Sequence, residues 1–299
     1  MQNYPLISII TVNYNQSVVT SQLLDTLKNL TYSKYEIIVV DNGSSKESPD
    51  WLKEKYPAIN LIKTGENLGF AGGNNVGINA SKGEYLLFIN NDTEVPANFI
   101  EPIVQLMENN RTIGMVSPKI KFYWDPSIIQ YAGFTKMSTI TIRNHSIGYL
   151  QKDSDSFNTT METHSIHGAA MMVKREVIET IGLMPQIYFL YYEEHDWAVK
   201  AKREGYKLYY CAQSHILHKE SLSTGKDSPL KTYYLNRGRL IYTIRNSKRR
   251  DLLLSLLFQF FISLPKNSTI FLIKREFQNL KAYWRAYFWV IKNFKQLSV

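Results

Sequence analysis

Three carboxylates lie within four residues in the segment Tyr-Tyr-Glu-Glu-His-Asp-Trp, residues 191–197. A carboxylate beside aromatic side chains can take a proton from a hydroxyl group while the rings pack against a sugar. On a helix, Glu194 and Asp196 point about 200° apart, so they cannot both face the same hydroxyl. Both remain candidate bases, Glu193 has room to pair elsewhere, and acidic stabilisation of a helix start is the alternative explanation for the cluster.

A fourth carboxylate, Asp92, follows the apolar run 85–89 and two asparagines. A carboxylate at a strand end, with diphosphate oxygens completing the shell, suits a Mg²⁺ or Mn²⁺ ion. The imidazole of His218 could bind the same ion. It precedes Glu220, Ser221 and Ser223, which are typical of a site loop. Capping of the helix near Pro96 is the alternative role for Asp92.

Two further clusters could hold a nucleotide. Asp41 ends the β-branched run 35–40 and could accept a hydrogen bond from a pyrimidine N–H or a ribose hydroxyl, although turn formation explains it equally well. The small residues of 67–77 stand at a predicted helix start, where bare N–H groups can approach phosphate or ribose. Their spacing is not G-x-G-x-x-G, so the dinucleotide-fold fingerprint is absent.

The elements that must position these residues alternate along the chain. Apolar runs predict strands, and helical spacing predicts the segments between them. The predicted strands are 6–13, 35–40, 59–63, 84–89 and 113–118, with helices at 18–30, 49–56, 71–80 and 96–108. This rhythm predicts right-handed crossovers and an α/β fold with a mainly parallel sheet. Asn13, Asp41 and Asp92 follow three of the strands, so we expect them around one crevice at the carboxyl edge.

The second half is less regular. Residues 119–165 read as a loop-rich insertion over the sheet. After it we expect strands at 166–173 and 207–211 and helices at 175–181, 193–204 and 230–246. The predicted organisation is a catalytic domain over residues 1–246 and a helical tail over 247–299.

The composition also indicates the cellular compartment in which the protein works. Cys211 is the single cysteine, so no intramolecular disulfide is possible, which fits the cytosol. Residues 1–15 carry no basic n-region, and we expect no signal peptide.

The net charge of +9 is concentrated in the tail. From Lys231 onward there are 14 Lys/Arg and 2 Asp/Glu, which leaves 21 basic and 24 acidic residues before it. The apolar run 252–264 would span only about 20 Å as a helix, against a hydrocarbon core of about 30 Å, so we expect no spanning helix. Basic residues interleaved with aromatic ones predict peripheral contact with the anionic inner face of the cell membrane. A helix packed on the catalytic domain is the alternative, and the tail is too apolar for nucleic acid.

Seven motifs occur in order between residues 6 and 246: SIITVNYN, VVDNGS, NLGFAGGNN, LFINND, HGAAMMV, YYEEHDW and HKESLS. Together they resemble the family-two glycosyltransferases of the GT-A fold, especially the rhamnosyltransferase-like members that build bacterial surface polysaccharides. The resemblance implies inverting transfer of a sugar, such as rhamnose, from a nucleotide-sugar donor to a glycan or lipid-linked acceptor.

The resemblance also implies roles for single residues. Asp41 would hold the nucleobase, with Thr11 and Asn13 nearby and Asn67 and Asn74 on the same nucleotide. Asp92 would be the last acid of the metal motif, where Asn90 and Asn91 replace acids that many members carry, and His218 would approach the same Mn²⁺ or Mg²⁺ ion. Glu194 falls at the position of the general base, with Asp196 as its rival.

Two other functions fit parts of the pattern. A nucleotidyltransferase has similar strand ends and metal chemistry, but it normally carries a Gly-rich basic loop after the first strand, where this chain reads Asn-Tyr-Asn-Gln-Ser-Val. A non-catalytic nucleotide- or carbohydrate-binding protein would share the pocket but release no nucleoside diphosphate.

Overall fold

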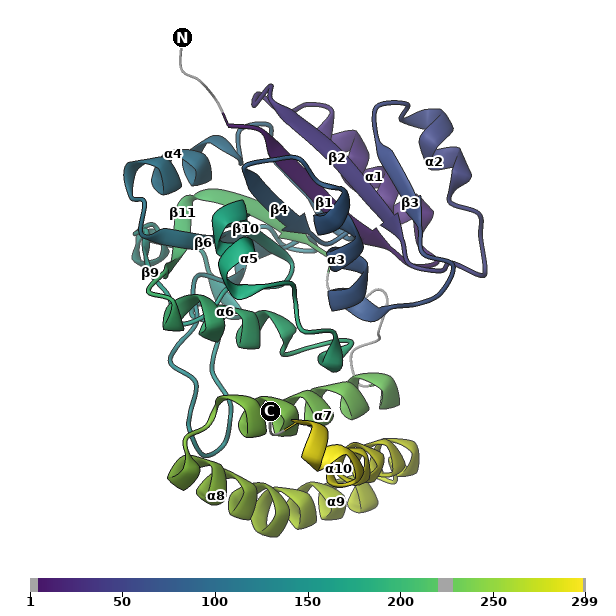
Figure 1. Cartoon of the computed structure of the whole chain (residues 1–299), viewed down its shortest axis with the longest axis vertical. Helices are drawn as coiled ribbons and strands as arrows, with labels where there is room; N and C mark the ends of the chain where they lie inside the picture. The colour runs from purple at the N-terminus through teal and green to yellow at the C-terminus, as the bar shows by residue number, and fades with distance from the viewer. Residues whose placement is uncertain (1–4, 220–227, 298–299) are drawn as a thin grey trace.

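The computed structural model describes residues 5–219 and 228–297 and is built on one mixed sheet (Figure 1). Its strands follow the order β3-β2-β1-β4-β10-β6-β11-β5, while β7, β8 and β9 extend it from β6 and β11. The strand bounds are β1 Ile7–Asn13, β2 Tyr35–Asp41, β3 Asn60–Lys63, β4 Tyr85–Ile89, β5 Thr93–Glu94, β6 Ile113–Phe122, β7 Ile128–Tyr131, β8 Gln151–Lys152, β9 Met161–Glu162, β10 Ala170–Lys174 and β11 Lys207–His218.

The mainly parallel sheet that the sequence predicts is confirmed, with one antiparallel strand at its centre. β1 pairs in parallel with β2 and β4, β2 with β3, and β6 with β11. β10 runs antiparallel between β4 and β6. The chain reaches β10 from the insertion that follows β6, and the insertion contains no crossover helix to carry it back to the other edge.

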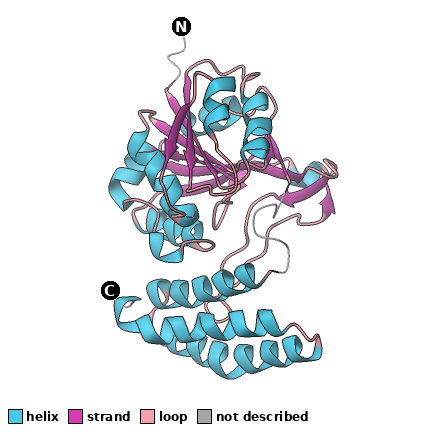
Figure 2. Ribbon diagram, turned by 90° about the vertical axis from the view of Figure 1, so that its right-hand side faces the viewer, coloured by secondary structure: helices cyan, strands magenta, loops and turns pink. Residues whose placement is uncertain are grey.

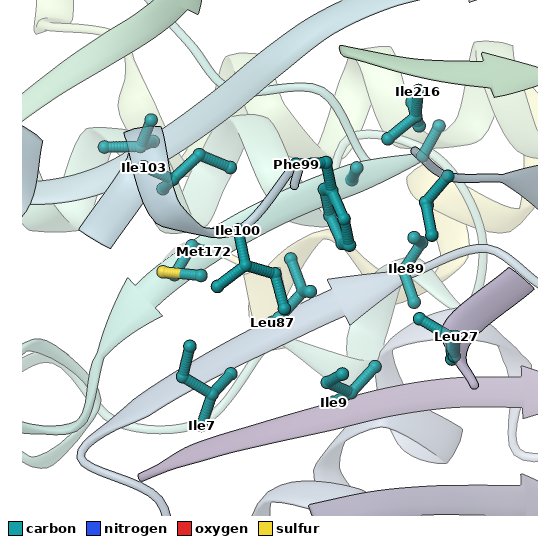
Figure 3. Packing of buried hydrophobic residues seen from close by; sticks show 14 of the residues in the cluster. Ile7, Ile9, Leu27, Leu87, Ile89, Phe99, Ile100, Ile103, Met172 and Ile216 are labelled. Carbon is teal, nitrogen blue, oxygen red and sulfur yellow. The ribbon is translucent and has the colours of Figure 1, made fainter. Parts of the chain in front are cut away.

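Helices cover both faces of this sheet. Their bounds are α1 Ser17–Leu27, α2 Asp50–Lys55, α3 Gly69–Ala80, α4 Glu101–Asn109, α5 Arg175–Ile181 and α6 Glu193–Arg203. One apolar cluster joins the sheet to α1, α2 and α4, and Figure 3 shows part of it around Leu87 and Phe99. A second cluster lies under α3, α5 and α6. Gly77 lets α3 approach β1 closely, since a β-carbon there would lie 2.4 Å from Ile10.

The last strand is longer than the sequence predicts. The expected strand ended at Cys211, but β11 continues to His218 after an irregular step in its register between Cys211 and His215. The polar residues of this extension hide its strand character, yet they are paired with β6 and β5. The extension places His218 opposite Thr93, and therefore beside Asp92.

Three helices form a separate layer beside the α/β part, as Figures 1 and 2 show from two sides. They are α7 Pro229–Asn246, the continuous run of α8 Arg249–Leu257, η3 Phe258–Ser263 and α9 Leu264–Ile273, and α10 Phe277–Leu297. Their common core includes Leu240, Tyr283 and Tyr287, together with Tyr188 and Tyr192 of the α/β part. The helix α7 thus packs with the tail, while its first turn lies at the carboxyl edge of the sheet.

The helix that runs from α8 to α9 is longer than the tail helix that the sequence predicts. It is one helix of 25 residues, Arg249–Ile273, with a mean hydropathy of 1.4 over its most apolar window. At 1.5 Å per residue it measures about 37 Å, so by length and composition it could cross a membrane. Pro265 does not end the helix, because the π-turns of η3 directly before it widen the backbone where the ring would meet a carbonyl group.

The inner face of this long helix mixes polar and apolar side chains, since Leu264 is buried there and Leu252, Leu256, Phe260 and Phe271 pack on the same core, while its outer stripe is apolar. Ser255, Gln259 and Ser263 recur every four residues, are buried, and hydrogen-bond to neighbouring segments. Large apolar side chains on the same helix are exposed: Leu253, Leu254, Leu257, Phe261, Ile262, Ile270, Leu272 and Ile273.

Candidate active site

A cavity of about 540 Å³ opens at the carboxyl edge of the sheet. It is bounded by the end of β1, the start of α3, the residues after β4, the loop before α6 and the first turn of α7. Among the predicted site residues, Asn67, Asn74, Asp92, Glu194 and His218 line it. Glu220, Ser221 and Ser223 lie outside the described residues.

Behind the cavity wall, the predicted strand-end residues form one buried network. Asn13 donates to the Asp41 carboxylate at 2.8 Å and accepts from Thr20 at 2.8 Å. Thr20 also accepts from Asn91 at 3.0 Å, which connects β2 to the residue next to Asp92. The ends of β1, β2 and β4 therefore meet as predicted.

Asp41, Asn13 and Thr11 do not line the cavity. Asp41 is 3% exposed, and its carboxylate accepts from Asn13 and from the hydroxyl and N–H of Ser44. Thr11 is fully buried, and its hydroxyl oxygen has no hydrogen-bond partner. In this arrangement Asp41 organises the loop after β2, while the neighbouring Asn42 lines the cavity.

Asp92 and His218 face each other across the cavity floor. Asp92 Oδ1 lies 3.2 Å from His218 Nε2, and both residues are less than a tenth exposed. The other ring nitrogen, Nδ1, is 2.8 Å from Gln130 Oε1. An amide oxygen accepts, so this contact holds the proton on Nδ1 and leaves Nε2 with a free lone pair toward Asp92.

This pair fits a divalent metal ion. Asp92 Oδ1 is buried without a hydrogen-bond partner, as a ligand atom waiting for a cation would be. Two ligands on one octahedral ion with bonds of about 2.1 Å are about 3 Å apart, close to the observed separation. Among the described residues no group of three or more His, Cys, Asp or Glu could hold a metal, so the remaining ligands would come from water and a diphosphate.

The start of α3 is already capped by the protein. The N–H groups of Leu68 and Gly69 donate to the side chains of Asn42 and Asn67. The N–H of Phe70 donates to the carbonyl oxygen of Phe189 at 2.7 Å. These three donors, which the sequence suggested as free for phosphate, are engaged here, so Asn67 fixes the loop while it lines the cavity.

The loop before α6 has an unusual backbone. Phe189, Tyr191 and Tyr192 have φ of 64°, 68° and 77°, a region that non-glycine residues seldom adopt. Such conformations concentrate at functional sites and persist only where the surroundings impose them. Here they turn the chain so that the first residues of α6 point into the cavity.

The acidic cluster divides between two roles. Glu194 lines the cavity with its side chain 18% exposed. Asp196 does not line the cavity, and its carboxylate is buried. It accepts hydrogen bonds from Arg245 Nε at 2.9 Å and from Asn246 Nδ2 at 2.7 Å, at the end of α7. The 200° separation predicted for a helix explains this division, and Asp196 joins α6 to α7 rather than facing a substrate.

Four residues of the site were not identified from the sequence. Glu193 lines the cavity although it was expected to pair elsewhere, and Gln130, Asn42 and His167 also contribute. Burial lowers the pKa of His167 to about 3, which leaves its imidazole neutral. Gln130 comes from β7, inside the segment that reads as irregular, so no local pattern points to it.

The helix α7 holds the left-handed loop in place. Arg237 is buried and donates to the carbonyl oxygens of Ile187 and Tyr188 at 2.9 and 2.5 Å. Its guanidinium also lies 4.6 Å from the ring centroid of Trp289 on α10. Through Arg237, the last helix of the tail supports the loop that presents Glu193 and Glu194.

Replacing Gly238 with alanine should therefore lower kcat about 10-fold or more. The added β-carbon would lie 2.9 Å from both the Tyr191 carbonyl oxygen and Tyr192 Cδ2, so the loop and the start of α6 must move. A displacement of about 1 Å at reacting groups can cost on the order of 10²-fold in rate. Nucleotide affinity measured by calorimetry should change less than kcat, because β1 and β2 lie away from this loop, and equal kcat for both proteins would contradict this account.

Comparison with known proteins identifies the family of this chain. The family model for glycosyl transferase family 2 matches residues 8–182, more than half of the 299-residue chain. The chain belongs to glycosyl transferase family 2. In this glycosyltransferase the matched range ends before Glu193, Glu194 and His218. The assignment of these residues to the cavity therefore rests on the geometry described above.

Curated relatives cover most of the chain at low identity. The low-salt glycan biosynthesis hexosyltransferase Agl10 of Haloferax volcanii is 28% identical over 247 residues, 79% of this chain and 74% of the relative. The N-acetylglucosaminyl-diphospho-decaprenol L-rhamnosyltransferase of Mycobacterium tuberculosis is 23% identical over 74% of this chain and 78% of its own length.

Solved structures confirm the GT-A fold. GalNAc-T7, determined with UDP, GalNAc and Mn²⁺, matches with a TM-score of 0.64 and 18% identity over 81% of this chain, which spans about half (48%) of that protein. The mannosyltransferase PcManGT of Pyrobaculum calidifontis, in complex with GDP-Man and Mn²⁺, matches with a TM-score of 0.60 and 17% identity over 95% of this chain and 86% of its own.

Proposed function

We propose that this glycosyltransferase moves a sugar from a nucleotide-sugar donor to a hydroxyl group of a glycan or lipid-linked acceptor, with inversion at the anomeric carbon. The observation that carries the proposal is the cavity itself. It is lined on one side by the metal-suited pair Asp92 and His218 and on another by the carboxylate Glu194. A single direct displacement needs a group that stabilises the departing diphosphate of the donor and a base that takes the proton from the attacking hydroxyl of the acceptor, and one displacement inverts the reacting carbon.

On the donor side, Asp92 and His218 would hold Mn²⁺ or Mg²⁺, which neutralises charge on the departing diphosphate. The orphaned Asp92 oxygen and the neighbouring lone pair of His218 are already arranged for this. Asn67 and Asn74 line the cavity where the nucleotide would lie, and the network of Asn13 and Asp41 supports the strand ends beneath it. Two GT-A neighbours were determined with Mn²⁺ and a nucleotide or nucleotide sugar, which supports the same arrangement here.

On the acceptor side, Glu194 would take the proton from the attacking hydroxyl. Gly168 lies next to this carboxylate, where even a β-carbon would be 3.9 Å from the carboxyl group, an ordinary van der Waals contact. The aromatic residues Phe189, Tyr191 and Tyr234 also line the cavity, and the rings of Phe189 and Tyr234 stack on each other with their centroids 4.9 Å apart.

A turnover assay tests the function. The full chain is incubated with Mn²⁺ and UDP-, GDP- or dTDP-sugars, with octyl N-acetylglucosaminide as the acceptor, and nucleoside diphosphate release and the glycoside product are measured. We expect acceptor-dependent release with one donor class, and the rhamnosyltransferase and hexosyltransferase relatives make dTDP-rhamnose and hexose donors the first to try. Binding of donors without any turnover would leave a non-catalytic binding protein as the function.

The place of action we propose is the cytoplasmic face of a membrane, where surface polysaccharides are assembled on lipid. The relatives include an O-antigen biosynthesis protein and an enzyme named for a diphospho-decaprenol acceptor. Large apolar side chains are exposed on the outer stripe of Arg249–Ile273 and, at Trp284, Phe288 and Ile291, on α10. These helices belong to the helical layer beside the α/β part (Figure 2).

The polarity of that long helix favours lipid contact over water. Leucine, isoleucine and phenylalanine side chains are exposed on its outer face, whereas its inner face buries the polar residues Ser255, Gln259 and Ser263 together with Leu264. A water-soluble helix would carry polar residues on its outer face. Basic residues flank it: Lys248, Arg249, Arg250, Lys274 and Arg275. Lys266 interrupts the apolar stretch, and α10 and α7 lie alongside the helix, so we propose that it lies in the membrane surface rather than across it.

Changing two exposed apolar residues of the long helix to acids should strongly weaken membrane binding. Each buried Leu or Phe side chain contributes about 1.5–3 kcal/mol, so Leu253→Glu with Phe261→Glu should lower the vesicle-bound fraction by about 10-fold or more. Sedimentation with anionic phospholipid vesicles measures it. Val18→Glu, a change on the exposed side of α1 at 61% exposure, is the matched control and should bind as wild type does. Equal binding of all three proteins would contradict the proposed surface.

A further inference from the structure

Glu193 is a buried acid with an unused oxygen in the wall of the cavity. It is the first residue of α6 and is 2% exposed. Its Oε2 atom is buried and has no hydrogen-bond partner, although the residue lines the cavity beside Glu194. An unsatisfied polar atom in such a position costs folding free energy unless a ligand completes it.

The loop before α6 surrounds this carboxyl group. The backbone N–H groups of Tyr191 and Glu193 act to lower its pKa, against the effect of burial. The left-handed conformation of Tyr191 and Tyr192 brings this backbone into place. Glu193 therefore lines the cavity with one carboxyl oxygen that has no hydrogen-bond partner among the described residues.

The surroundings favour the neutral form of this group. Burial raises the pKa of Glu193 well above its usual range, and the adjacent Glu194 carboxylate adds to the effect. Arg237 acts in the opposite direction, with its Nη2 donating to the carbonyl oxygens of Ile187 and Tyr188 and its buried Nε without a hydrogen-bond partner, but burial is the largest effect. Two neighbouring carboxyl groups in different environments can thus take different protonation states.

We propose that Glu193 acts as a neutral carboxylic acid whose Oε2–H donates a hydrogen bond to an oxygen of the acceptor sugar. This inference rests on the proposed glycosyl transfer and names the group that positions its acceptor. Glu194 accepts the proton of the attacking hydroxyl, and Glu193 holds a neighbouring hydroxyl or ring oxygen of the same sugar. The pair gives one donor and one acceptor side by side, so the acceptor sugar is fixed in orientation before transfer.

The protonation state can be tested without activity. Infrared difference spectra of the full-length protein at pH 7, wild type minus Glu193→Gln, should contain the C=O stretching band of a protonated carboxylic acid. The band should shift when octyl N-acetylglucosaminide is added, because the O–H gains a partner. A difference spectrum that shows only carboxylate bands would overturn the proposal, whatever the enzyme transfers.

The kinetic test uses two variants. Glu193→Leu removes the donor and should raise the acceptor KM about 10-fold, the loss of one hydrogen bond, with nucleotide affinity retained. Glu193→Gln supplies an amide N–H in place of the O–H and should restore most of that loss. If Glu193→Gln is as inactive as Glu194→Gln, Glu193 acts as a charged group and the proposal is wrong. If the wild-type protein turns over no donor, the proposed function fails, and the infrared result still decides the protonation state.

Discussion

Glu194→Gln should lower kcat roughly 10²–10⁴-fold while donor binding stays nearly unchanged. The amide keeps the shape of the side chain and its place in the cavity wall, but it cannot take a proton from the acceptor hydroxyl. Glu194 lines the cavity, and its side chain is 18% exposed, so an acceptor hydroxyl in the cavity could reach its carboxylate. Steady-state kinetics with the donor identified by the turnover assay, together with calorimetric titration of that donor, separate the two effects.

The matched comparison is Asp196→Asn. Asp196 is bonded to Arg245 and Asn246 away from the cavity, so its loss should appear as a lower melting temperature, with kcat per folded molecule largely kept. If Glu194→Gln retains near-normal kcat while Asp196→Asn is inactive with donor affinity intact, the general base has been assigned to the wrong carboxylate.

Asp92→Ala should lower the rate on the order of 10²-fold or more. The substitution removes one of two protein ligands that the described residues offer to the metal, and several kcal/mol of leaving-group stabilisation go with it. The apparent Mn²⁺ concentration needed for half-maximal activity should rise as well. Activity measured over a Mn²⁺ titration, with and without EDTA, gives both values.

Asp25→Ala provides the control for this change. Asp25 is an acid on α1 whose side chain is 47% exposed and whose partners are the surface lysines Lys28 and Lys55. It should leave the metal dependence unaltered. Full activity of Asp92→Ala in the presence of EDTA would show that the reaction does not depend on a metal at this position.

The sequence was sufficient to predict the parallel strands β1 to β4 and the edge of the sheet at which they end. Apolar runs ending in Asn13, Asp41 and Asp92 define strands by local pattern, and parallel strands must present their carboxyl ends on one side. The structure brings these ends together through hydrogen bonds among Asn13, Asp41, Thr20 and Asn91. Helical periodicity was also enough to predict that Glu194 and Asp196 face different directions.

The long-range contacts were beyond such patterns. His218 reaches Asp92 because β11 continues through a polar stretch whose strand character depends on pairing with β6 and β5. Gln130, which orients His218, comes from a segment that reads as irregular. Pairing between distant strands is decided by the whole sheet, so local propensity carries little information about it.

The tail shows the same division between sequence and structure. Its basic and aromatic composition predicts a membrane-facing helix, and charge counting alone separates it from the slightly acidic catalytic part. Its length was misjudged, because the turns of η3 carry the helix past Pro265, which sequence rules treat as a helix end. Only the packed structure shows that Ser255, Gln259 and Ser263 are buried while large apolar side chains of the same helix are exposed.

What the sequence determined by itself is which residue types stand at the strand ends and at one helix start, and from these it predicts a metal-assisted transfer with a carboxylate base. What the tertiary structure decided is the burial and the partners of the three clustered carboxylates. Arg245 and Asn246 bind Asp196, the left-handed loop buries Glu193, and Glu194 alone keeps a partly exposed carboxylate in the cavity. Residue type and spacing are local properties, whereas burial and partners depend on segments far away in the chain, and they set the charge and access of each acid.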